Sequence, residues 1–321
     1  MTSPLFLDAA QVAERLSLDV CTGLMREAMR ALSGGEVEQA LRSFLKLGEG
    51  RTFALMPAGF VPGGPFGAKL VSVFADPDHP GRRSHEGLVI LFDGRSGAPV
   101  CVADGGEVTR IRTASASAAA TDALASPDAS RLAIFGTGVQ AHTHALAIAH
   151  VRKLEQIIVW GRDRDLAGAL AARLASELNI DAMAEPDPAR AARADIISTV
   201  TASAEPVLKG KWVQPGTHVN LAGSSGPHAA EADSALVAAA RFIADHRTHV
   251  LAHGGEFLRA RQAGLIDDDH IVAEIGEVYA GTQAGRTGPE DITIYKSLGH
   301  AVQDLAAVAW LYNDMKARGQ G

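Results

Sequence analysis

A glycine turn between an apolar run and a helical stretch constrains the fold of this chain more than any other feature. Residues 131–135 (RLAIF) are typical of a buried strand, and the pattern Gly-x-Gly-x-x-Ala follows directly. Gly136 permits a tight turn, Gly138 lets the backbone approach a pyrophosphate, and Ala141 lets the next helix pack closely on the strand. Because the first N–H groups of a helix bind phosphate, this turn predicts a dinucleotide site. The residues expected to contact the cofactor there are Gly136, Thr137, Gly138, Val139 and Gln140.

The segments after this turn alternate between strand-like and helix-like character. Apolar runs at 157–160, 195–200 and 218–222 are separated by stretches with helical spacing. Strands that alternate with helices in this way form a parallel sheet. We therefore expect a Rossmann fold, a doubly wound parallel α/β sheet.

The first hundred residues are organised differently. Two helix-like stretches precede Gly34, and short β-prone runs follow, ending in a predicted hairpin at 88–103. Residues 109–125 are rich in Ala, Ser and Thr and lack Gly and Pro, which favours a helix that joins two domains. We expect the last helix, 297–315, to return to the first domain. The expected domains are an α+β domain of residues 1–113 and 297–321, and a Rossmann domain of residues 114–296.

The end of the second expected Rossmann strand bears on the choice between NAD and NADP. A strict NAD site usually has an acidic residue there, which accepts a hydrogen bond from the ribose 2′-hydroxyl. Here the strand is followed by three candidate cofactor residues, Gly161, Arg162 and Asp163. Gly161 leaves room, and Arg162 is suited to pair with the 2′-phosphate of NADP. Alternatively, Asp163 accepts from the 2′-hydroxyl of NAD and Arg162 stacks on adenine, so the cofactor is NAD or NADP, with a slight preference for NADP.

Composition excludes several other classes of protein. The net charge of −7 argues against a nucleic-acid partner, because phosphate binding requires concentrated Lys and Arg. With Cys21 and Cys101 as its cysteines, the chain has neither a disulfide framework nor a Cys-rich zinc site. No apolar run approaches the roughly 18 residues that cross a bilayer. The first residues do not resemble a signal peptide, so we expect a cytoplasmic protein without a membrane partner.

Three histidines have the spacing of one helix face. They are His246, His249 and His253. Such a set can bind zinc, but a solvated helix face explains it better in the absence of nearby cysteines. We expect no metal site.

Several short segments spread along the chain carry a resemblance to a known family. Besides the glycine turn, these segments are Arg42-Ser-Phe, Met56-Pro57, Lys69-Leu-Val, residues 109–121 around Arg112-Thr113, residues 220–227, Gly276-Glu277-Val278 and residues 296–299. With them the chain resembles the ornithine cyclodeaminase/mu-crystallin family over nearly its whole length. That family includes cyclodeaminases, alanine dehydrogenases and imino-acid reductases. The resemblance implies that both chain ends form a substrate-binding and dimerisation domain, whose sheet pairs with that of a second subunit in a homodimer.

The resemblance also implies roles for individual residues. Arg42 and Arg112 correspond to the pair that clamps the substrate α-carboxylate, which suits the bidentate geometry of a guanidinium group. Lys69 corresponds to the active-site lysine near the substrate nitrogen or carboxylate, and partial burial would lower its pKa and suit proton transfer. Thr113 is expected to contact cofactor phosphate or ribose, and Ser297 to lie near the nicotinamide.

One departure from the family pattern bears on the reaction. Cyclodeaminases carry an aspartate where this chain has Ser225, and a hydroxyl is a far weaker base than a carboxylate. Ser225 therefore favours imine reduction over deaminating cyclisation, and it is expected in the substrate site. A dicarboxylate substrate would need a further cation, for which His85 and Lys296 are candidates.

The expected function is that of an NAD(P)H-dependent oxidoreductase acting on C=N or CH–NH2 groups. It would reduce a small, anionic 2-imino carboxylate to the amino acid, with amino-acid dehydrogenation as the reverse reaction. Candidate substrates are iminosuccinate, pyrroline-2-carboxylate and the imine of pyruvate. One alternative is an ornithine-type cyclodeaminase, a lyase with bound NAD. A second is a non-catalytic, mu-crystallin-like binding protein, against which the joint presence of Lys69, Arg42 and Arg112 argues.

Overall fold

The contacts of the chain divide it into two compact units. The computed structural model describes residues 3–49, 51–74 and 85–319. Unit 1 comprises Met1–Arg112 and His300–Gly321, and unit 2 comprises Thr113–Gly299. None of the helices formed by the described residues is long and apolar enough to cross a membrane.

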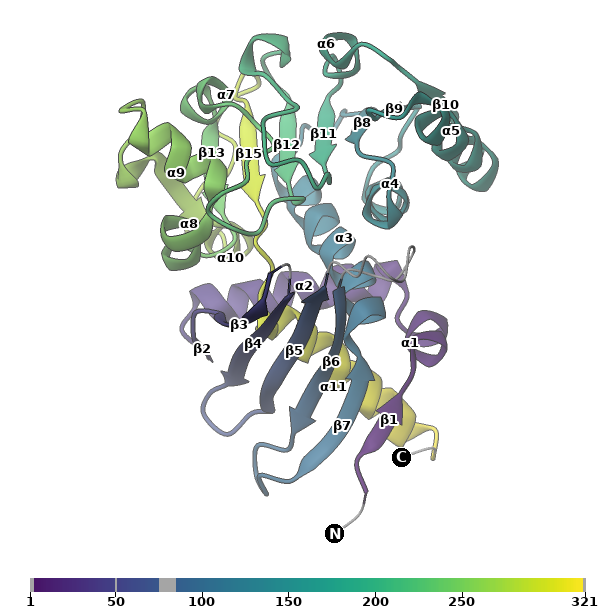
Figure 1. The fold of residues 1–321 in the computed structure, drawn as a ribbon, viewed down its shortest axis with the longest axis vertical. Helices are drawn as coiled ribbons and strands as arrows, with labels where there is room; N and C mark the ends of the chain where they lie inside the picture. Colours follow the sequence, from purple (N-terminus) through teal and green to yellow (C-terminus); the bar gives the residue numbers. More distant parts are fainter. Residues whose placement is uncertain (1–2, 50, 75–84, 320–321) are drawn as a thin grey trace. The chain divides into compact units, whose positions relative to one another are not determined.

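Unit 1 is a mainly antiparallel sheet with helices on one face (Figure 1). Its strands in the described residues are β1 (Leu5–Leu7), β2 (Val37–Gln39), β3 (Ser43–Gly48), β4 (Arg51–Phe60), β5 (Phe66–Phe74), β6 (His85–Phe92) and β7 (Pro99–Asp104). The order is β1-β7-β6-β5-β4-β2, with β3 paired to β4 and β1 parallel to β7. The helices are α1 (Ala9–Arg15), α2 (Leu18–Ser33) and α11 (Ala301–Ala317). The predicted hairpin at 88–103 is present as β6 and β7.

The two faces of this sheet differ in burial. Side chains alternate between the faces of a strand, so Lys69, opposite Val89, points to the face that α11 covers. The next row, Leu55, Leu70 and Leu88, points to the other face. Several large apolar side chains of unit 1 are exposed: Phe6, Phe44, Leu45, Leu47, Leu55, Phe66 and Leu88.

Unit 2 is a parallel sheet of Rossmann type. Its strands are β8 (Arg131–Phe135), β9 (Gln156–Trp160), β10 (Asp181–Ala184), β11 (Ile196–Thr199), β12 (His218–Leu221), β13 (Arg241–Ala244), β14 (Ile271–Glu274) and β15 (Thr293–Lys296). All neighbours in the order β10-β9-β8-β11-β12-β15-β13-β14 are parallel. The order reverses direction between β8 and β11, which is the switch point where open α/β sheets bind ligands. The expected fold class is confirmed.

Helices and a buried core complete unit 2. The helices are α4 (Val139–Val151), α5 (Arg164–Leu178), α6 (Pro188–Ala191), α7 (Ser234–Ala239), α8 (Arg247–His253), α9 (Gly255–Gln262) and α10 (Ile275–Tyr279), with short 3-10 turns η1 (Gly210–Trp212) and η2 (Asp268–His270). All four residues of β11 and of β12 are buried, as are Leu132–Phe135 of β8. Continuous burial of this kind arises when both faces of a parallel sheet are covered.

Two predicted helix boundaries are wrong for local reasons. The joining helix α3 (Gly105–Leu124) begins before residue 109, because the Asp104 carboxylate accepts a hydrogen bond from Glu107 N at 2.6 Å and caps its first turn. The last helix begins at Ala301 rather than at Ser297. Gly299 has a φ of 78°, a left-handed conformation that interrupts a helix, and His300 then caps α11.

The burial of α11 on the unit 1 sheet has a measurable consequence for stability. Leu311 is fully buried on α11, whereas Leu166 on α5 is exposed. We expect Leu311→Ala to lower the free energy of unfolding by about 2–5 kcal/mol, because the truncation leaves a cavity. The matched Leu166→Ala is expected to change it by less than about 0.5 kcal/mol. Urea denaturation followed by circular dichroism measures both values, and equal values for the two variants would contradict the packing of α11.

Candidate functional site

The glycine turn of unit 2 has the geometry that a dinucleotide requires. Gly136 has a φ of +137°, and a Cβ there would lie 2.9 Å from the carbonyl oxygen of Val200. Gly138 is the N-cap of α4, and no side chain among the described residues caps that helix end. A Cβ on Gly138 would meet nothing within 4 Å, so the turn is open on this side. The first turn of α4 contains no acidic residue, so this helix end presents the positive end of its dipole at the open turn.

Gly161, which follows β9, packs against the glycine turn that follows β8. A Cβ on Gly161 would lie 2.5 Å from Cγ2 of Thr137, so glycine is required for the two segments to approach. The backbone agrees, since Gly136 N donates to Trp160 O at 2.9 Å. The predicted cofactor residues at 136–140 and at 161 are therefore adjacent.

The two residues after Gly161 have different surroundings. Asp163 is the N-cap of α5, and its Oδ1 accepts from Asp165 N and Leu166 N, both at 3.0 Å. Arg162 is exposed, and within the described part of the chain it makes no hydrogen bond or ion pair. One oxygen of the only acidic candidate is thus already used, whereas the guanidinium group of Arg162 is available.

Two further predicted cofactor residues carry buried hydroxyl groups. Thr113 Oγ1 and Ser297 Oγ, both in unit 2, have no hydrogen-bond partner among the described residues. A buried polar group without a partner costs about 1–3 kcal/mol, so such atoms point to a ligand. With the open glycine turn and the uncapped α4, they fit a bound nicotinamide dinucleotide.

A buried cluster of charges lies in unit 1. Oδ1 of Asp304, on the first turns of α11, accepts hydrogen bonds from Nζ of Lys69 on β5 and from Nε of Arg112 on α3, both at 3.1 Å. The side chain of Asp304 is fully buried, and those of Lys69 and Arg112 are each 6% exposed. Lys69 also donates to Thr109 Oγ1, and Arg112 Nη1 donates to Gln303 Oε1 at 3.1 Å. Strand β5, helix α3 and helix α11 therefore meet at this cluster.

The proton affinity of Lys69 reflects this environment. Burial lowers the pKa of Lys69 to about 8; Asp304 opposes that shift, and the charges of Arg112 and Arg42 add to it. The influence of Arg42 places its guanidinium group within electrostatic reach of Lys69. Burial alone would raise the pKa of Asp304, but Arg112 and Lys69 hold it below its ordinary value. The cluster thus contains an ionised carboxylate and a lysine that exchanges its proton near neutral pH.

Sequence reasoning missed Asp304, although it predicted the three cations around it. Asp304 lies 235 residues from Lys69 and 192 from Arg112, so no spacing pattern links them. A useful signal was its place on the first turn of a C-terminal helix, where a carboxylate is favoured by the helix dipole.

Ser225 lies on the exposed loop that follows β12 in unit 2. Glu231, which sequence reasoning also missed, shapes this loop. Its buried carboxylate accepts from Thr199 Oγ1 at 2.8 Å, from Thr201 N and Oγ1 at 2.6 and 2.8 Å, and from Gly223 N at 2.7 Å. These bonds tie together the segments after β11 and β12.

Lys296 is not available to a second substrate carboxylate. It is fully buried, lies 2.8 Å from Glu256 Oε2, and donates to Ser224 O at 2.6 Å. Its positive charge is neutralised within unit 2, so it is wrong as the cation for a dicarboxylate. The side chain of His85, the other candidate, lies outside the described part of the structure.

Two of the three histidines, at the start of α8 (N-cap His246), make a ring contact. His246 and His249 meet edge to face at 5.0 Å, and His246 Nε2 lies 4.0 Å from Glu274 Oε1. Within the described residues, no group of three or more His, Cys, Asp or Glu has a geometry that holds a metal ion.

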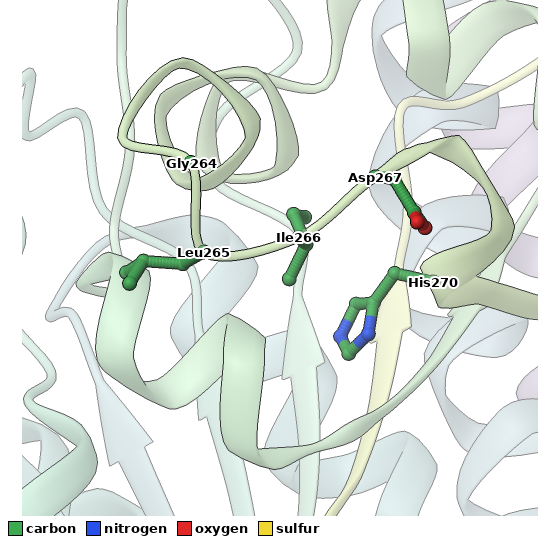
Figure 2. A pocket seen from close by; sticks show the side chains of 5 residues that line it. All are labelled: Gly264, Leu265, Ile266, Asp267 and His270. Atoms are coloured by element: carbon green, nitrogen blue, oxygen red, sulfur yellow. The ribbon is translucent and has the colours of Figure 1, made fainter.

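A shallow depression on unit 2 has no role in this chemistry. Figure 2 shows its lining residues, Gly264, Leu265, Ile266, Asp267 and His270. The depression has a volume of about 420 Å³. Nε2 of His270 is hydrogen-bonded to Val237 O at 2.7 Å, and none of the predicted site residues lines the depression.

Comparison with known proteins agrees with this arrangement. The model of the ornithine cyclodeaminase/mu-crystallin family matches residues 2–319. The ketimine reductase mu-crystallin of Mus musculus is 32% identical over 316 residues, 97% of each chain. The Δ1-pyrroline-2-carboxylate reductase of Thermococcus litoralis, solved with NADH and L-proline, is 29% identical with a TM-score of 0.93 over 98% of each chain. An archaeal alanine dehydrogenase dimer with bound NAD is 29% identical, with a TM-score of 0.93 over 99% of this chain and 98% of its own.

These similarities confirm the expected class of enzyme, an NAD(P)-dependent oxidoreductase acting on C=N or CH–NH2 groups. They also leave both NAD and NADP as cofactors, as the sequence did. The chain belongs to the ornithine cyclodeaminase/mu-crystallin family.

Proposed function

We propose that this chain reduces a small 2-imino carboxylate to the corresponding amino acid with NADH or NADPH. The observation that carries the proposal is the buried cluster of unit 1, in which Lys69, with a pKa lowered to about 8, lies beside Arg112 and within the field of Arg42. Similar solved structures include a Δ1-pyrroline-2-carboxylate reductase, an alanine dehydrogenase and an iminosuccinate reductase, so their chemistry covers all three candidate imines. Iminosuccinate is less favoured, since Lys296 is neutralised by Glu256.

The proposed substrate contacts follow from the unused donors of the cluster. A guanidinium group has five N–H donors, and Arg112 spends two on Asp304 and Gln303. The remaining donors of Arg112, together with Arg42, would hold the α-carboxylate. Ser225 is proposed as a neutral contact, since its hydroxyl adds no charge to the site and does not act as a strong base.

The proton needed by the substrate nitrogen would come from Lys69. The nicotinamide supplies a hydride to the imine carbon, and the nitrogen takes up a proton if it is not already protonated. Lys69 is mostly charged at pH 7, because its pKa is about 8, and its Nζ is therefore able to donate that proton.

The dinucleotide would be held by unit 2. We assign the pyrophosphate to residues 136–140, the ribose end to Gly161 and Arg162, and the nicotinamide end to Thr113 and Ser297. Arg162 favours NADP, because it is exposed without a partner among the described residues, while Asp163 Oδ1 is used to cap α5.

We further propose that the protein acts in the cytoplasm. Cys21 and Cys101 are buried and form no disulfide with each other, and chains without disulfides are usual in a reducing compartment.

Turnover with imino acids tests the proposal. Purified protein is mixed with NADH or NADPH and with 2-oxo acids plus ammonia or methylamine, or with preformed cyclic imines, and oxidation of the cofactor is followed at 340 nm. We expect Lys69→Ala and Arg112→Ala to lower kcat/KM by about 10²–10⁴-fold while dinucleotide binding is retained. Lys316→Ala, on the exposed end of α11, serves as the control. Ammonia release from ornithine without net NADH consumption would instead identify a cyclodeaminase, and parental rates in both active-site variants would overturn the assignment.

The choice of cofactor is tested at Arg162. A hydrogen-bonded contact to a charged group contributes about 1.5–3 kcal/mol, so Arg162→Ala should raise the KM for NADPH by roughly 10–100-fold. The KM for NADH should change little, because NADH lacks the 2′-phosphate. Arg173→Ala, an exposed arginine on α5, is the matched control. An equal change in both KM values would show that Arg162 does not contact the 2′-phosphate.

We propose that the exposed face of the unit 1 sheet is the interface of a homodimer. Phe6, Leu45 and Leu55, all on this face, are 60%, 59% and 38% exposed, and large apolar patches on soluble proteins usually mark an interface.

A charge on this face should separate the subunits. We expect Leu45→Glu to weaken dimerisation by about a hundredfold, because an unpaired charge would be buried in the interface. Met183→Glu, at an exposed methionine on β10 of unit 2, should leave it unchanged. Light scattering coupled to size-exclusion chromatography gives the mass of each variant. A dimer that persists in Leu45→Glu, or a parent protein that is monomeric, would rule this interface out.

A further inference from the structure

We propose that Asp304 is a positioning residue, which keeps Lys69 charged and holds Arg112 beside it without contacting the substrate. This inference rests on the proposed function, because it concerns the residue that sets the charge of Lys69 and the position of Arg112 in the proposed substrate site. Nothing in the family resemblance or in the predicted roles involves this aspartate.

The geometry around Asp304 ties one of its oxygens to both cations of the cluster. Both Lys69 and Arg112 donate to the same oxygen, Oδ1, at 3.1 Å. The other oxygen, Oδ2, is buried and has no hydrogen-bond partner among the described residues. The carboxylate is therefore shielded from solvent, and it acts through the two cations that it binds.

The cluster would be electrostatically unstable without this anion. Three charged groups act on Lys69: Asp304 on α11, Arg112 on α3, and Arg42 in the segment before β3. Three cations near one another repel, and Lys69 and Arg112 are also removed from water, so burial favours the neutral form of the one that readily loses its proton, Lys69. Asp304 is the group that opposes both effects.

Loss of the carboxylate therefore has a defined sign. In Asp304→Asn, burial, Arg112 and Arg42 continue to lower the pKa of Lys69, and the opposing anion is gone. An opposite charge at such a distance typically shifts a pKa by about 1–3 units, so Lys69 should titrate about 1–3 pH units below its parental value. The proton-donating form is then lost at lower pH, and the basic limb of the pH profile of kcat/KM for imine reduction moves in the same direction. At pH 7 the rate should fall on the order of tenfold and recover as the pH is lowered toward 5.

Two measurements separate this inference from the proposed function. The titration of the Lys69 side chain is followed by NMR on full-length protein with ¹³C-labelled lysine, assigned with Lys69→Arg; this readout does not depend on turnover. The pH profile of imine reduction is the second readout. If the parent protein reduces no imine, the proposed function fails, yet the NMR titration still tests the role of Asp304.

Control variants exclude a merely structural effect. Asp314→Asn removes a carboxylate from the same helix, where it pairs with Arg15 and Arg318, and should leave both readouts unchanged. Asp304→Glu retains the charge and should restore most of the Lys69 titration. If Asp304→Asn does not fold, Lys69→Met in the parent tests the pair from the other side, since removal of the lysine should raise the pKa of the Asp304 carboxyl, seen in its ¹³Cγ shift. An unchanged Lys69 titration in Asp304→Asn, or an unchanged Asp304 titration in Lys69→Met, would overturn the inference.

Discussion

The carboxylate of Asp304 is the interaction on which the chemistry of unit 1 depends. A substrate carboxylate needs cations, but burying Lys69 and Arg112 side by side costs several kcal/mol for each charge unless an anion compensates them. Asp304 supplies that anion through a single oxygen, 3.1 Å from each cation. Because Asp304 belongs to α11 and Lys69 to β5, the same contact joins the two ends of the chain in one unit. The packing of α11 on the N-terminal sheet thus stabilises the fold and also brings Asp304 to Lys69 and Arg112.

In unit 2, the site depends on how closely the turns at the carboxyl ends of the parallel strands approach one another. The turns after β8 and β9 approach so closely that Gly136 and Gly161 have no room for a side chain. After β11 and β12 the chain is held by one buried carboxylate, that of Glu231, which accepts from Thr199, Thr201 and Gly223. Backbone fit at one pair of strands and a buried anion at the next therefore shape the edge where doubly wound folds bind their ligands.

The charged residues of both units show that chemical type alone does not define a functional cation. Lys69 and Lys296 are both buried and both paired with a carboxylate. Burial is the largest cause of the lowered pKa of Lys69; the charges of Arg112 and Arg42 add to it, and Asp304, which Lys69 shares with Arg112, opposes it. Lys296 lies 2.8 Å from Glu256 Oε2 and donates to the carbonyl of Ser224, in the loop that carries Ser225. The two lysines therefore differ in what their carboxylates bind: Asp304 also pairs with a second cation, Arg112, whereas Glu256 also accepts from Glu231 N.

The sequence by itself determined the features that depend on neighbours along the chain. The strand and glycine turn at 131–141, the alternation of strands and helices after it and the two-domain division all follow from local spacing, because backbone conformation and apolar periodicity are local properties. The motif around Arg112 and the segment at Lys69 supported the family resemblance on the same basis. The sequence did not predict the short strand β15, which includes Lys296, because four residues that are all buried show no periodicity. It also did not predict that α11 begins at Ala301. Asp304 and Glu231 were decided only by the tertiary structure, because a buried carboxylate acquires its role from donors that lie up to 235 residues away, which only the folded chain brings within hydrogen-bond distance.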